Sequence, residues 1–295
     1  GLLKTTNNGI TFEHQFDREA TVSIGDVCVA PSNKNIVWVG TGENNPRNSV
    51  SYGDGVYQSA DGGKTWKNKG LKGSFQIGKI AIHPRNPDIV YVGAMGRLYG
   101  PNQERGLFKT TNGGKTWDRV LFVNERTVVI DVAMNPHNPD VLLVAAWERQ
   151  RDAFDSHPGS ELPPAEGYNI WDPIQKWGPG SGLYLTRDGG QTFQKISAGL
   201  PTCDLGRIGL DFYRKDPRIV FAIIDSAKTG MGLPPPRAFL GVAGETTRAG
   251  VRVGSIVPDS PAAKAGLREG DRLRLIGKKE IKAFAHVIEA LEGKK

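Results

Sequence analysis

The sequence contains very little cysteine, with only Cys28 and Cys203 among its 295 residues. Two cysteines this far apart support neither a disulfide framework nor a cysteine-based metal site. Cys28 lies in an apolar, strand-like stretch, so we expect a buried free thiol there. The sequence also lacks any apolar run near the roughly 18 residues that a membrane helix needs. It starts at Gly1 without a basic and apolar leader, and we expect a signal peptide to lie further upstream.

Most of the chain also lacks an excess of either charge, although the net charge is +7. Residues 237–295 hold 12 Lys/Arg and 7 Asp/Glu, which gives this segment +5 and leaves +2 for the rest. A nucleic-acid-binding protein more often carries a clustered basic stripe with interleaved aromatic residues, so the sequence argues against nucleic acid as a partner. His83 and His137 each stand next to a proline in a turn-like stretch, and we expect neither a metal ion nor a cofactor.

Glycine, by contrast, is plentiful, and a short phrase that contains glycine occurs four times. The phrase reads Ser/Thr-x-Asp/Asn-x-Gly-x-Thr-aromatic and covers residues 5–12, 59–66, 110–117 and 186–193. We expect a hairpin turn, because an Asp or Asn side chain can accept hydrogen bonds from N–H groups two residues on and glycine adopts φ > 0 without a clash. The aromatic residue then enters a strand, where its ring packs against the sheet.

This phrase resembles the Asp box of bacterial neuraminidase repeat (BNR) proteins. The resemblance implies a structural turn between the two outer strands of a propeller blade, away from any active site. We therefore interpret its residues as scaffold, and they are Asp61, Gly63, Trp66, Asn112, Gly114, Trp117, Asp188, Gly190 and Phe193.

A second pattern stands between these turns: an alternating strand, an Asn/Pro turn and a second strand rich in β-branched residues. It occurs four times between residues 24 and 224, and Pro31, Pro84 and Pro136 of successive copies lie 53 and then 52 residues apart. A period near fifty with four strands per unit is typical of a β-propeller.

The predicted fold class is all-β: a partial β-propeller of four-stranded blades at 1–226, a stiff linker at 227–236 and a small α+β domain at 237–295. The propeller part holds half a blade, three whole blades between residues 24 and 198, and the start of a fifth unit. Closed propellers have at least four blades and no long open edges, so we expect this chain to be a fragment.

Strand direction alternates, so the connections between the second and third strands of each blade share one face of the disc. These connections are long, irregular loops, and such loops often carry function. A glycoside hydrolase would need two carboxyl groups about 5–10 Å apart on this face. The candidate catalytic residues are Glu43, Asp54 and Glu148, with Asp152 and Asp155 as further carboxylates and Tyr99, Trp171 and Trp177 as aromatic residues that could stack on sugar rings.

A sialidase would instead need a cluster of arginines for the substrate carboxylate, together with a tyrosine nucleophile. The loops carry Arg47, Arg97, Arg149 and Arg151, but no spacing singles out a triad. We expect these charged residues to form an ordinary solvated, ion-paired loop face rather than a catalytic centre.

The phrases at 39–45, 52–57 and 104–109 resemble those of bacterial sortilin-type propellers, and the resemblance covers residues 1–226. It implies a large disc that binds peptides and proteins without known catalytic residues. Xyloglucanase-type propellers share the Asp box and hydrolyse glycans, but no motif here matches their catalytic acids.

Residues 237–295 resemble a bacterial PDZ domain of the type attached to periplasmic proteases. The string Ser-Pro-Ala-x-x-Ala-Gly-Leu-x-x-Gly-Asp at 260–271 carries this resemblance. An amphipathic helix is expected at 284–291, with its apolar face formed by Phe284, Val287, Ile288 and Leu291.

In that family, the loop before the first strand offers backbone N–H groups to the terminal carboxylate of a peptide, which then adds a strand to the sheet. The resemblance therefore implies peptide binding by Phe239, Leu240, Gly241 and Val242. The alternative is that this loop only makes a tight turn and that the groove stays empty or self-occupied.

The last strands of a PDZ domain would follow the helix, so we expect this domain to be cut at Lys295. It begins where the third strand of a further blade is expected, which predicts insertion into a propeller loop. The leading hypothesis is a secreted or periplasmic bacterial scaffold whose propeller and PDZ domain both bind proteins or peptides. The competing hypothesis is a glycoside hydrolase or glycan-binding propeller that uses the loop carboxylates and aromatic residues.

Overall fold

The computed structural model describes residues 1–45, 49–151, 175–228 and 240–291. The chain forms two compact units, Gly1–Thr229 and Gly230–Lys295, which we call the N-terminal and the C-terminal unit. Each is described by itself.

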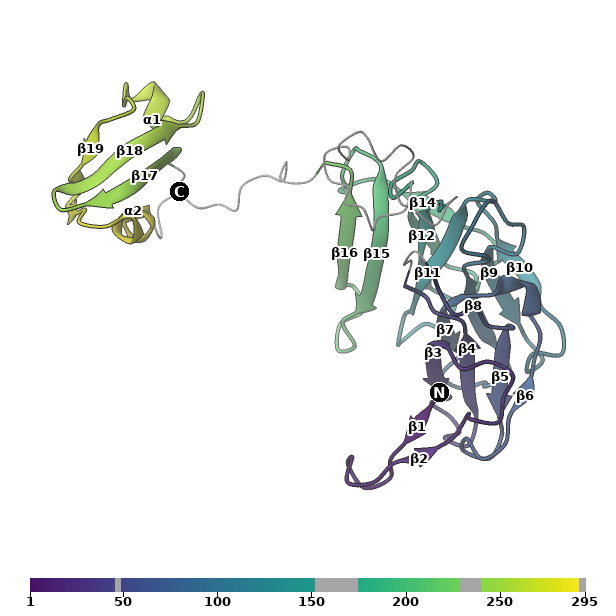
Figure 1. Cartoon of the computed structure of the whole chain (residues 1–295). Helices are drawn as coiled ribbons and strands as arrows, with labels where there is room; N and C mark the ends of the chain where they lie inside the picture. Colours follow the sequence, from purple (N-terminus) through teal and green to yellow (C-terminus); the bar gives the residue numbers. More distant parts are fainter. Residues whose placement is uncertain (46–48, 152–174, 229–239, 292–295) are drawn as a thin grey trace. The chain divides into compact units, whose positions relative to one another are not determined.

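The N-terminal unit contains three antiparallel sheets in which the four strands follow one another in chain order (Figure 1). We call these sheets blades 1, 2 and 3. Blade 1 consists of β3 (Ile24–Val29), β4 (Val37–Thr41), β5 (Val56–Ser59) and β6 (Lys67–Asn68). Blade 2 consists of β7 (Ile77–Ile82), β8 (Val90–Ala94), β9 (Gly106–Thr110) and β10 (Asp118–Leu121). Blade 3 consists of β11 (Thr127–Met134), β12 (Leu142–Glu148), β13 (Gly182–Thr186) and β14 (Gln194–Ile196).

Two-stranded sheets stand before and after the three blades. β1 (Leu3–Lys4) pairs with β2 (Glu13–His14), and β15 (Leu205–Phe212) pairs with β16 (Val220–Ser226). A single 3₁₀ turn, Lys72–Ser74, links blades 1 and 2. The predicted fold class, a partial β-propeller followed by a small α+β domain, is confirmed.

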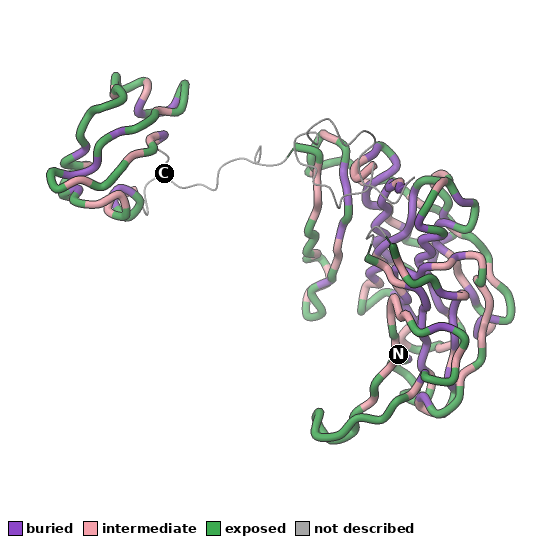
Figure 2. The backbone as a smooth tube through the Cα atoms, viewed as in Figure 1, coloured by how far each residue is buried: buried purple, intermediate pink, exposed green. Residues whose placement is uncertain are grey.

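The first strands of successive units lie next to one another: β3 contacts β7, β7 contacts β11, and β11 contacts β15. The second strands β4, β8 and β12 are buried along their whole length, because each is flanked by strands and covered by neighbouring blades (Figure 2). Glycine permits the close approach of the first strands. A Cβ atom on Gly25 would lie 2.1 Å from the carbonyl oxygen of Ile77, so any side chain there would force blades 1 and 2 apart.

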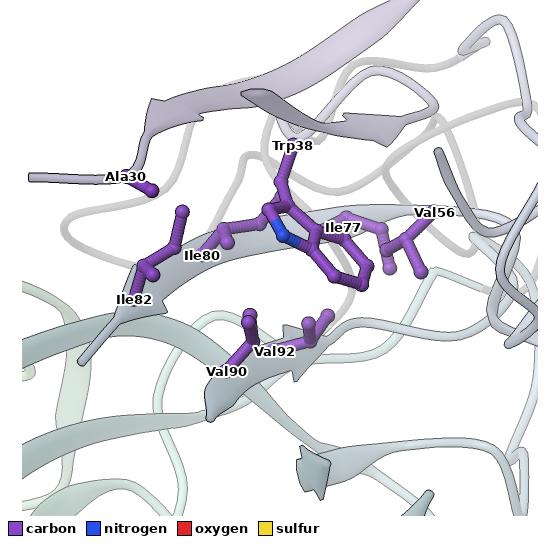
Figure 3. Packing of buried hydrophobic residues seen from close by; sticks show 8 residues of the cluster. All are labelled: Ala30, Trp38, Val56, Ile77, Ile80, Ile82, Val90 and Val92. Carbon is purple, nitrogen blue, oxygen red and sulfur yellow. The ribbon is translucent and has the colours of Figure 1, made fainter. Parts of the chain in front are cut away.

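The hydrophobic core lies between the blades rather than within one sheet. Trp38 of blade 1 packs against Ile77, Ile80, Val90 and Val92 of blade 2, as Figure 3 shows. All five side chains are at most 2% exposed. Since burial of one such side chain contributes about 1.5–3 kcal/mol, the contact between blades is a main source of stability.

Aspartates in two first strands add hydrogen bonds between units. The Oδ2 atom of Asp26 accepts from the backbone N–H of Ile80 at 2.7 Å, and Oδ2 of Asp131 accepts from that of Leu210 at 2.8 Å. Burial raises the pKa of Asp26, although the hydrogen bond from Ile80 and the charge of Lys79 act in the opposite direction. These bonds fix the register of one blade against the next.

The segments Ser59–Trp66, Thr110–Trp117 and Thr186–Phe193, which we call the repeat turns, join the third and fourth strands of the three blades. In the first of them, Oδ1 of Asp61 accepts hydrogen bonds from the N–H groups of Lys64 (3.0 Å) and Thr65 (2.9 Å). The bonded N–H groups are therefore three and four residues on, not two as the sequence suggested. The Oγ atom of Ser59 meanwhile accepts from the N–H of Gly63, whose φ is +96°.

The tryptophans of the first two repeat turns contact the preceding unit as well as the core beside their own blades. Nε1 of Trp66 donates to the carbonyl of Gln15 at 2.6 Å, and Nε1 of Trp117 donates to that of Lys69 at 2.7 Å. The ring of Trp117 also meets that of Trp38 edge-on, with centroids 5.9 Å apart. The sequence predicted packing against the sheet but not these hydrogen bonds, in which backbone carbonyls of the preceding unit accept from the indole N–H groups.

The C-terminal unit combines a small sheet with two helices. β17 (Val242–Thr247), β18 (Gly250–Ile256) and β19 (Arg272–Leu273) form one sheet, and β20 (Leu275–Ile276) pairs with β21 (Lys279–Glu280). α1 (Pro261–Lys264) begins after Ser260, whose Oγ accepts from the N–H of Ala263 at 3.2 Å. This N-cap, followed by proline in the first turn, explains the Ser-Pro start of the string noted above.

α2 (Phe284–Leu291) has the predicted bounds but a different buried face. Val287 and Ala290 are buried, whereas Ile288 is 54% exposed. Phe284 and Leu291 pack partly against the core that Val251, Val253, Leu273 and Ile281 form with them. The helix therefore leaves Ile288 outside the core, and the predicted place of Ile288 in the buried face was wrong.

We expect neutralisation of two repeat-turn aspartates to change stability only in acid. Hydrogen bonds, first from the Thr65 and Thr192 hydroxyls, hold the pKa values of Asp61 and Asp188 well below the usual range. A lowered pKa stabilises the fold above the unfolded pKa of about 4, and this contribution is lost as pH falls further. In the second repeat turn the neutral Asn112 stands in the place of the aspartate, and its Oδ1 accepts the equivalent hydrogen bonds from the N–H groups of Lys115 and Thr116, both at 3.0 Å.

The measurement is the melting temperature of the double variant Asp61→Asn/Asp188→Asn between pH 7 and pH 2. It should match the wild type near pH 7 and fall less steeply below pH 4. Asp118→Asn is the control, because the Asp118 side chain accepts no hydrogen bond within the described residues. Identical acid slopes for the wild type and the double variant would contradict the prediction.

Trp117→Phe should destabilise the N-terminal unit by about 1 kcal/mol, because the ring is kept but its hydrogen bond to the Lys69 carbonyl is lost. Trp117→Ala, which also removes the contact with Trp38, should cost clearly more. Urea unfolding measures both. Equal unfolding midpoints for Trp117→Phe and the wild type would show that the bond between blades contributes nothing.

Candidate functional site

One face of the N-terminal unit carries the loop residues that the sequence singled out. We call it the loop face; it comprises the connections β4–β5, β8–β9 and β12–β13 and the segments that link successive units. Gln76, in the segment between blades 1 and 2, joins these parts. Its Nε2 donates to the carbonyl of Glu43 at 2.8 Å, and its Oε1 accepts from Nη2 of Arg149 at 2.8 Å. Its backbone carbonyl accepts from the N–H of Met95, in the β8–β9 connection, at 2.9 Å, so loops of all three blades meet at this residue.

Asp54, a candidate catalytic carboxylate, holds the start of β5. Its Oδ2 accepts from the hydroxyl of Tyr57 at 2.8 Å, and its backbone N–H donates to Oγ1 of the buried Thr41 at 2.9 Å. Asn68 in β6 donates to the backbone carbonyl of Asp54 at 3.0 Å. These contacts all lie within blade 1, which makes Asp54 part of the framework of that blade.

Glu148, another candidate, ends β12 and is only 6% exposed. Its Oε2 accepts from the N–H of Gly180 at 2.6 Å, and its Oε1 accepts from Nε2 of Gln175 at 3.0 Å. The carboxylate thus fixes the end of the β12–β13 connection against the strand. Both oxygens are engaged within blade 3, and no hydrogen bond connects Glu148 to Asp54.

Glu43, the third candidate, follows β4 and is half-buried. Its backbone N–H donates to Ser51 at 2.9 Å, while its carbonyl accepts from Gln76. The remaining candidates that lie outside the described residues are Arg47, Asp152, Asp155 and Trp171.

Arginines form the unexpected part of the loop face. Arg105, Arg149 and Arg151 are at most 1% exposed. Arg105 donates from Nη2 to the carbonyls of Arg97 and Gly100, both at 3.1 Å, and from Nη1 to that of Arg149 at 3.4 Å. We call Arg105, Arg149 and Arg151 the arginine cluster. The sequence had placed Arg149 and Arg151 on a solvated, ion-paired face, whereas the structure buries them.

Burial lowers the pKa of both linked guanidinium groups. For Arg149 the pKa falls to about 9, first through burial and then through the charges of Arg105, Arg151 and Arg207. For Arg105 it falls to about 10 through burial and the charge of Arg97. Both groups still carry their proton at neutral pH, so the loop face contains a concentrated positive charge beneath its surface.

A cavity of about 410 Å³ lies at the same face. Its lining includes Tyr52, Phe75, Gln76, Arg97, Leu98 and Tyr99. The rings of Tyr52 and Phe75 meet edge-on with centroids 6.0 Å apart, and Tyr52 is 72% exposed. The cavity shares Gln76 and Arg97 with the hydrogen bonds of the arginine cluster, so its wall borders the buried charge.

Sequence analysis missed Arg105 and Gln76 as members of this site. Arg105 directly precedes a buried strand and Arg149 directly follows one, and a charged residue next to a buried strand end is the signal that was available. Gln76 gave no signal of its own, because its partners are 33 and 73 residues away in the chain.

The C-terminal unit carries the predicted peptide-binding loop. Leu240 and Gly241 accept hydrogen bonds at their carbonyls from the N–H groups of Ala262 and Val257, both at 2.9 Å. Gly241 has a φ of +80°, which strains any other residue. Val242 opens β17, and Phe239 lies outside the described residues.

No group of three or more His, Cys, Asp or Glu residues within the described part of the chain is arranged to hold a metal ion. Cys28 and Cys203 are free thiols, and burial raises the pKa of Cys28. Among the described residues, no helix has the length and apolar character that a membrane crossing requires.

Comparisons with protein families give two matches. Residues 54–230, more than half of the chain, match the Sortilin-Vps10 family, described as sortilin or neurotensin receptor 3. Residues 248–295 match a PDZ-domain family. A search of curated proteins gave no match.

Three solved structures similar to this chain are GH74 enzymes. An ancestral GH74 enzyme is 17% identical with a TM-score of 0.47, and the match covers 79% of this chain and 23% of that one. The GH74 xyloglucanase from Xanthomonas campestris is 13% identical with a TM-score of 0.43, and the match covers 66% of this chain and 26% of that one. The Niastella koreensis GH74 enzyme is 16% identical with a TM-score of 0.49, and the match covers 88% of this chain and 40% of that one. This chain therefore spans less than half the length of each of these structures.

Proposed function

Because the chain belongs to the Sortilin-Vps10 family and also carries a PDZ domain, we propose that it is a non-catalytic scaffold that binds proteins or peptides. The observation that carries this proposal is the loop at Gly241, with its fixed backbone beside an edge strand. PDZ domains bind peptides in general by adding them to such an edge.

The backbone of the loop supports this mode of binding. The carbonyls of Leu240 and Gly241 both bond inward, which fixes the peptide planes and thereby orients the N–H groups of the loop. Oriented N–H groups can hold the terminal carboxylate of a peptide without reorganisation. A glycine at φ +80° makes this conformation accessible.

The edge of β17 offers the remaining main-chain contacts. Within the described residues, β17 pairs only with β18, so its other edge is open to an added strand. The N–H of Phe284, at the start of α2, donates to Oγ1 of Thr246 in β17 at 3.1 Å, which holds the helix beside this strand. Ile288, exposed on α2, would supply apolar contact for a side chain of the bound peptide.

The competing hypothesis of a glycan hydrolase or lectin finds less support in the described residues of the site. Both oxygens of Glu148 and one oxygen of Asp54 accept hydrogen bonds within their own blades. A hydrolytic pair would instead need two carboxyl groups facing one substrate bond. The propeller part of the proposal therefore rests on family membership, with proteins or peptides as partners outside the cytoplasm.

The proposal includes the organisation of the chain: propeller at 1–226, linker at 227–236 and PDZ domain at 237–295, inserted into the connection after the second strand of a further blade. β15 and β16 are the first two strands of such a blade. The coding sequence downstream of Lys295 is therefore expected to contain another repeat turn, and DNA sequencing checks this. A reading frame without one would contradict the insertion.

Gly241→Val should abolish most binding of a peptide with a free C-terminal carboxylate, because a β-branched residue at φ +80° distorts the loop. Affinity is measured by titrating the full chain with a C-terminal peptide library and with the same peptides amidated. We expect a loss of about tenfold or more from either change, as removal of one charge-assisted contact gives.

Gly266→Val is the matched control. Gly266 also has a φ of +80°, and a Cβ atom there would meet nothing within 4 Å. The Gly266→Val substitution introduces the same backbone strain outside the binding loop and should leave the affinity for the peptide unchanged. Equal loss of affinity in both variants, or equal binding of free and amidated peptides, would refute the assignment of the loop.

A further inference from the structure

Two buried guanidinium groups of the loop face have no anionic partner among the residues that the structure describes. Arg105 and Arg149 are 0% and 1% exposed, and neither forms an ion pair within the described residues. Nε of Arg105, and Nε and Nη1 of Arg149, donate no hydrogen bond in the described part of the chain. Burial of a cation without a counter-charge is strongly unfavourable, so this position favours the arrival of an anion.

Other arginines among the described residues add positive charge near Arg149. Arg151 belongs to the same cluster, and Arg207, whose Nη1 donates to Oδ1 of Asn45 at 3.0 Å, contributes to the field at Arg149. The hydrogen bonds that Arg149 and Arg105 do donate go to neutral acceptors, namely Oε1 of Gln76 and three backbone carbonyls. Because the surrounding protein has a low dielectric constant, the positive field of these arginines extends into the space beside them.

That adjacent space is the 410 Å³ cavity, whose size suits a small organic molecule rather than a folded partner. Gln76 lines the cavity, and its Oε1 accepts a hydrogen bond from Nη2 of Arg149. An anion beside Gln76 would therefore either accept this hydrogen bond in place of Gln76 or be attracted by the charge of Arg149 behind it. Arg97 also lines the cavity, and its backbone carbonyl accepts a hydrogen bond from Nη2 of Arg105. The other walls are apolar or aromatic, with Phe75, Tyr52 and Leu98 among them.

We propose that this cavity binds a small aromatic carboxylate, with the ring against Tyr52 and Phe75 and the carboxylate at Gln76, in the field of the arginine cluster. The ring geometry supports an aromatic body, since aromatic pairs prefer edge-to-face and offset contacts. The carboxylate follows from the guanidinium groups of Arg105 and Arg149, which have no ion pair within the described residues, because arginine matches carboxylates in charge and in hydrogen-bond geometry. This binding site lies in the N-terminal unit and is independent of the peptide-binding loop.

The test uses a pair of probes that differ only in charge. The full chain is titrated calorimetrically with 2-naphthoate and with neutral 2-naphthamide, and inorganic phosphate serves as an anion without a ring. We expect naphthoate to bind about tenfold more tightly than naphthamide, and phosphate to bind more weakly than naphthoate. Equal affinity for the two naphthalene probes, or displacement of naphthoate by equimolar phosphate, would overturn the proposal.

Gln76→Glu tests the role of the buried charge. The new carboxylate would lie beside Nη2 of Arg149 and neutralise it from within, so the melting temperature should rise and the preference for naphthoate over naphthamide should disappear. Gln194→Glu, on the exposed part of β14, is the control for the added charge and should change neither property. Retention of the full preference in Gln76→Glu would show that the arginine cluster plays no part.

Tyr52→Ala tests the ring without disturbing the core, because Tyr52 is 72% exposed. It should weaken the binding of naphthoate and of naphthamide by a similar factor, since both lose the same aromatic contact. An unchanged affinity for both probes would place the ligand elsewhere and refute the proposal.

Discussion

The N-terminal unit depends on one constraint: no blade can bury its own faces, so each must be covered by the next. Trp38 of blade 1 has its packing partners in blade 2, and Trp117 of blade 2 reaches back to the carbonyl of Lys69 in blade 1. Every blade thus both covers its neighbour and is held by it. In such a repeat array, stability is a sum of contacts between neighbours rather than a property of one central core.

This constraint explains why the repeat turns are so alike. Their side-chain hydrogen bonds close the hairpin without using the surface of the sheet, and Asp61, Asn112 and Asp188 accept equivalent bonds from N–H groups. In the first two turns, the tryptophan that follows donates a hydrogen bond to a carbonyl of the preceding unit. The aspartate is not needed for its charge, because asparagine at the second turn makes the same bonds to N–H groups.

Local patterns determined what could be predicted from the sequence. The strands, the turns and the fold class follow from contacts between residues close in the chain, and the period of the repeats revealed them. The destination of the Trp117 ring and the meeting of Gln76 with Arg149 depend on partners 48 and 73 residues away, which no local pattern encodes. The same holds for α2, where only the packing of the whole C-terminal unit decides that Ala290 is buried and Ile288 exposed.

The two proposed binding regions use opposite physical strategies. At Gly241, hydrogen bonds fix the backbone in advance, so binding needs little reorganisation and little stability is sacrificed. At Arg105 and Arg149, guanidinium groups are buried without an ion pair among the described residues, which costs stability. Buried charges are an exception in a unit whose interior is otherwise mainly apolar, and such exceptions occur mainly at binding or functional sites. The burial of Arg105 and Arg149 is thus understandable as the cost of a site that attracts an anion.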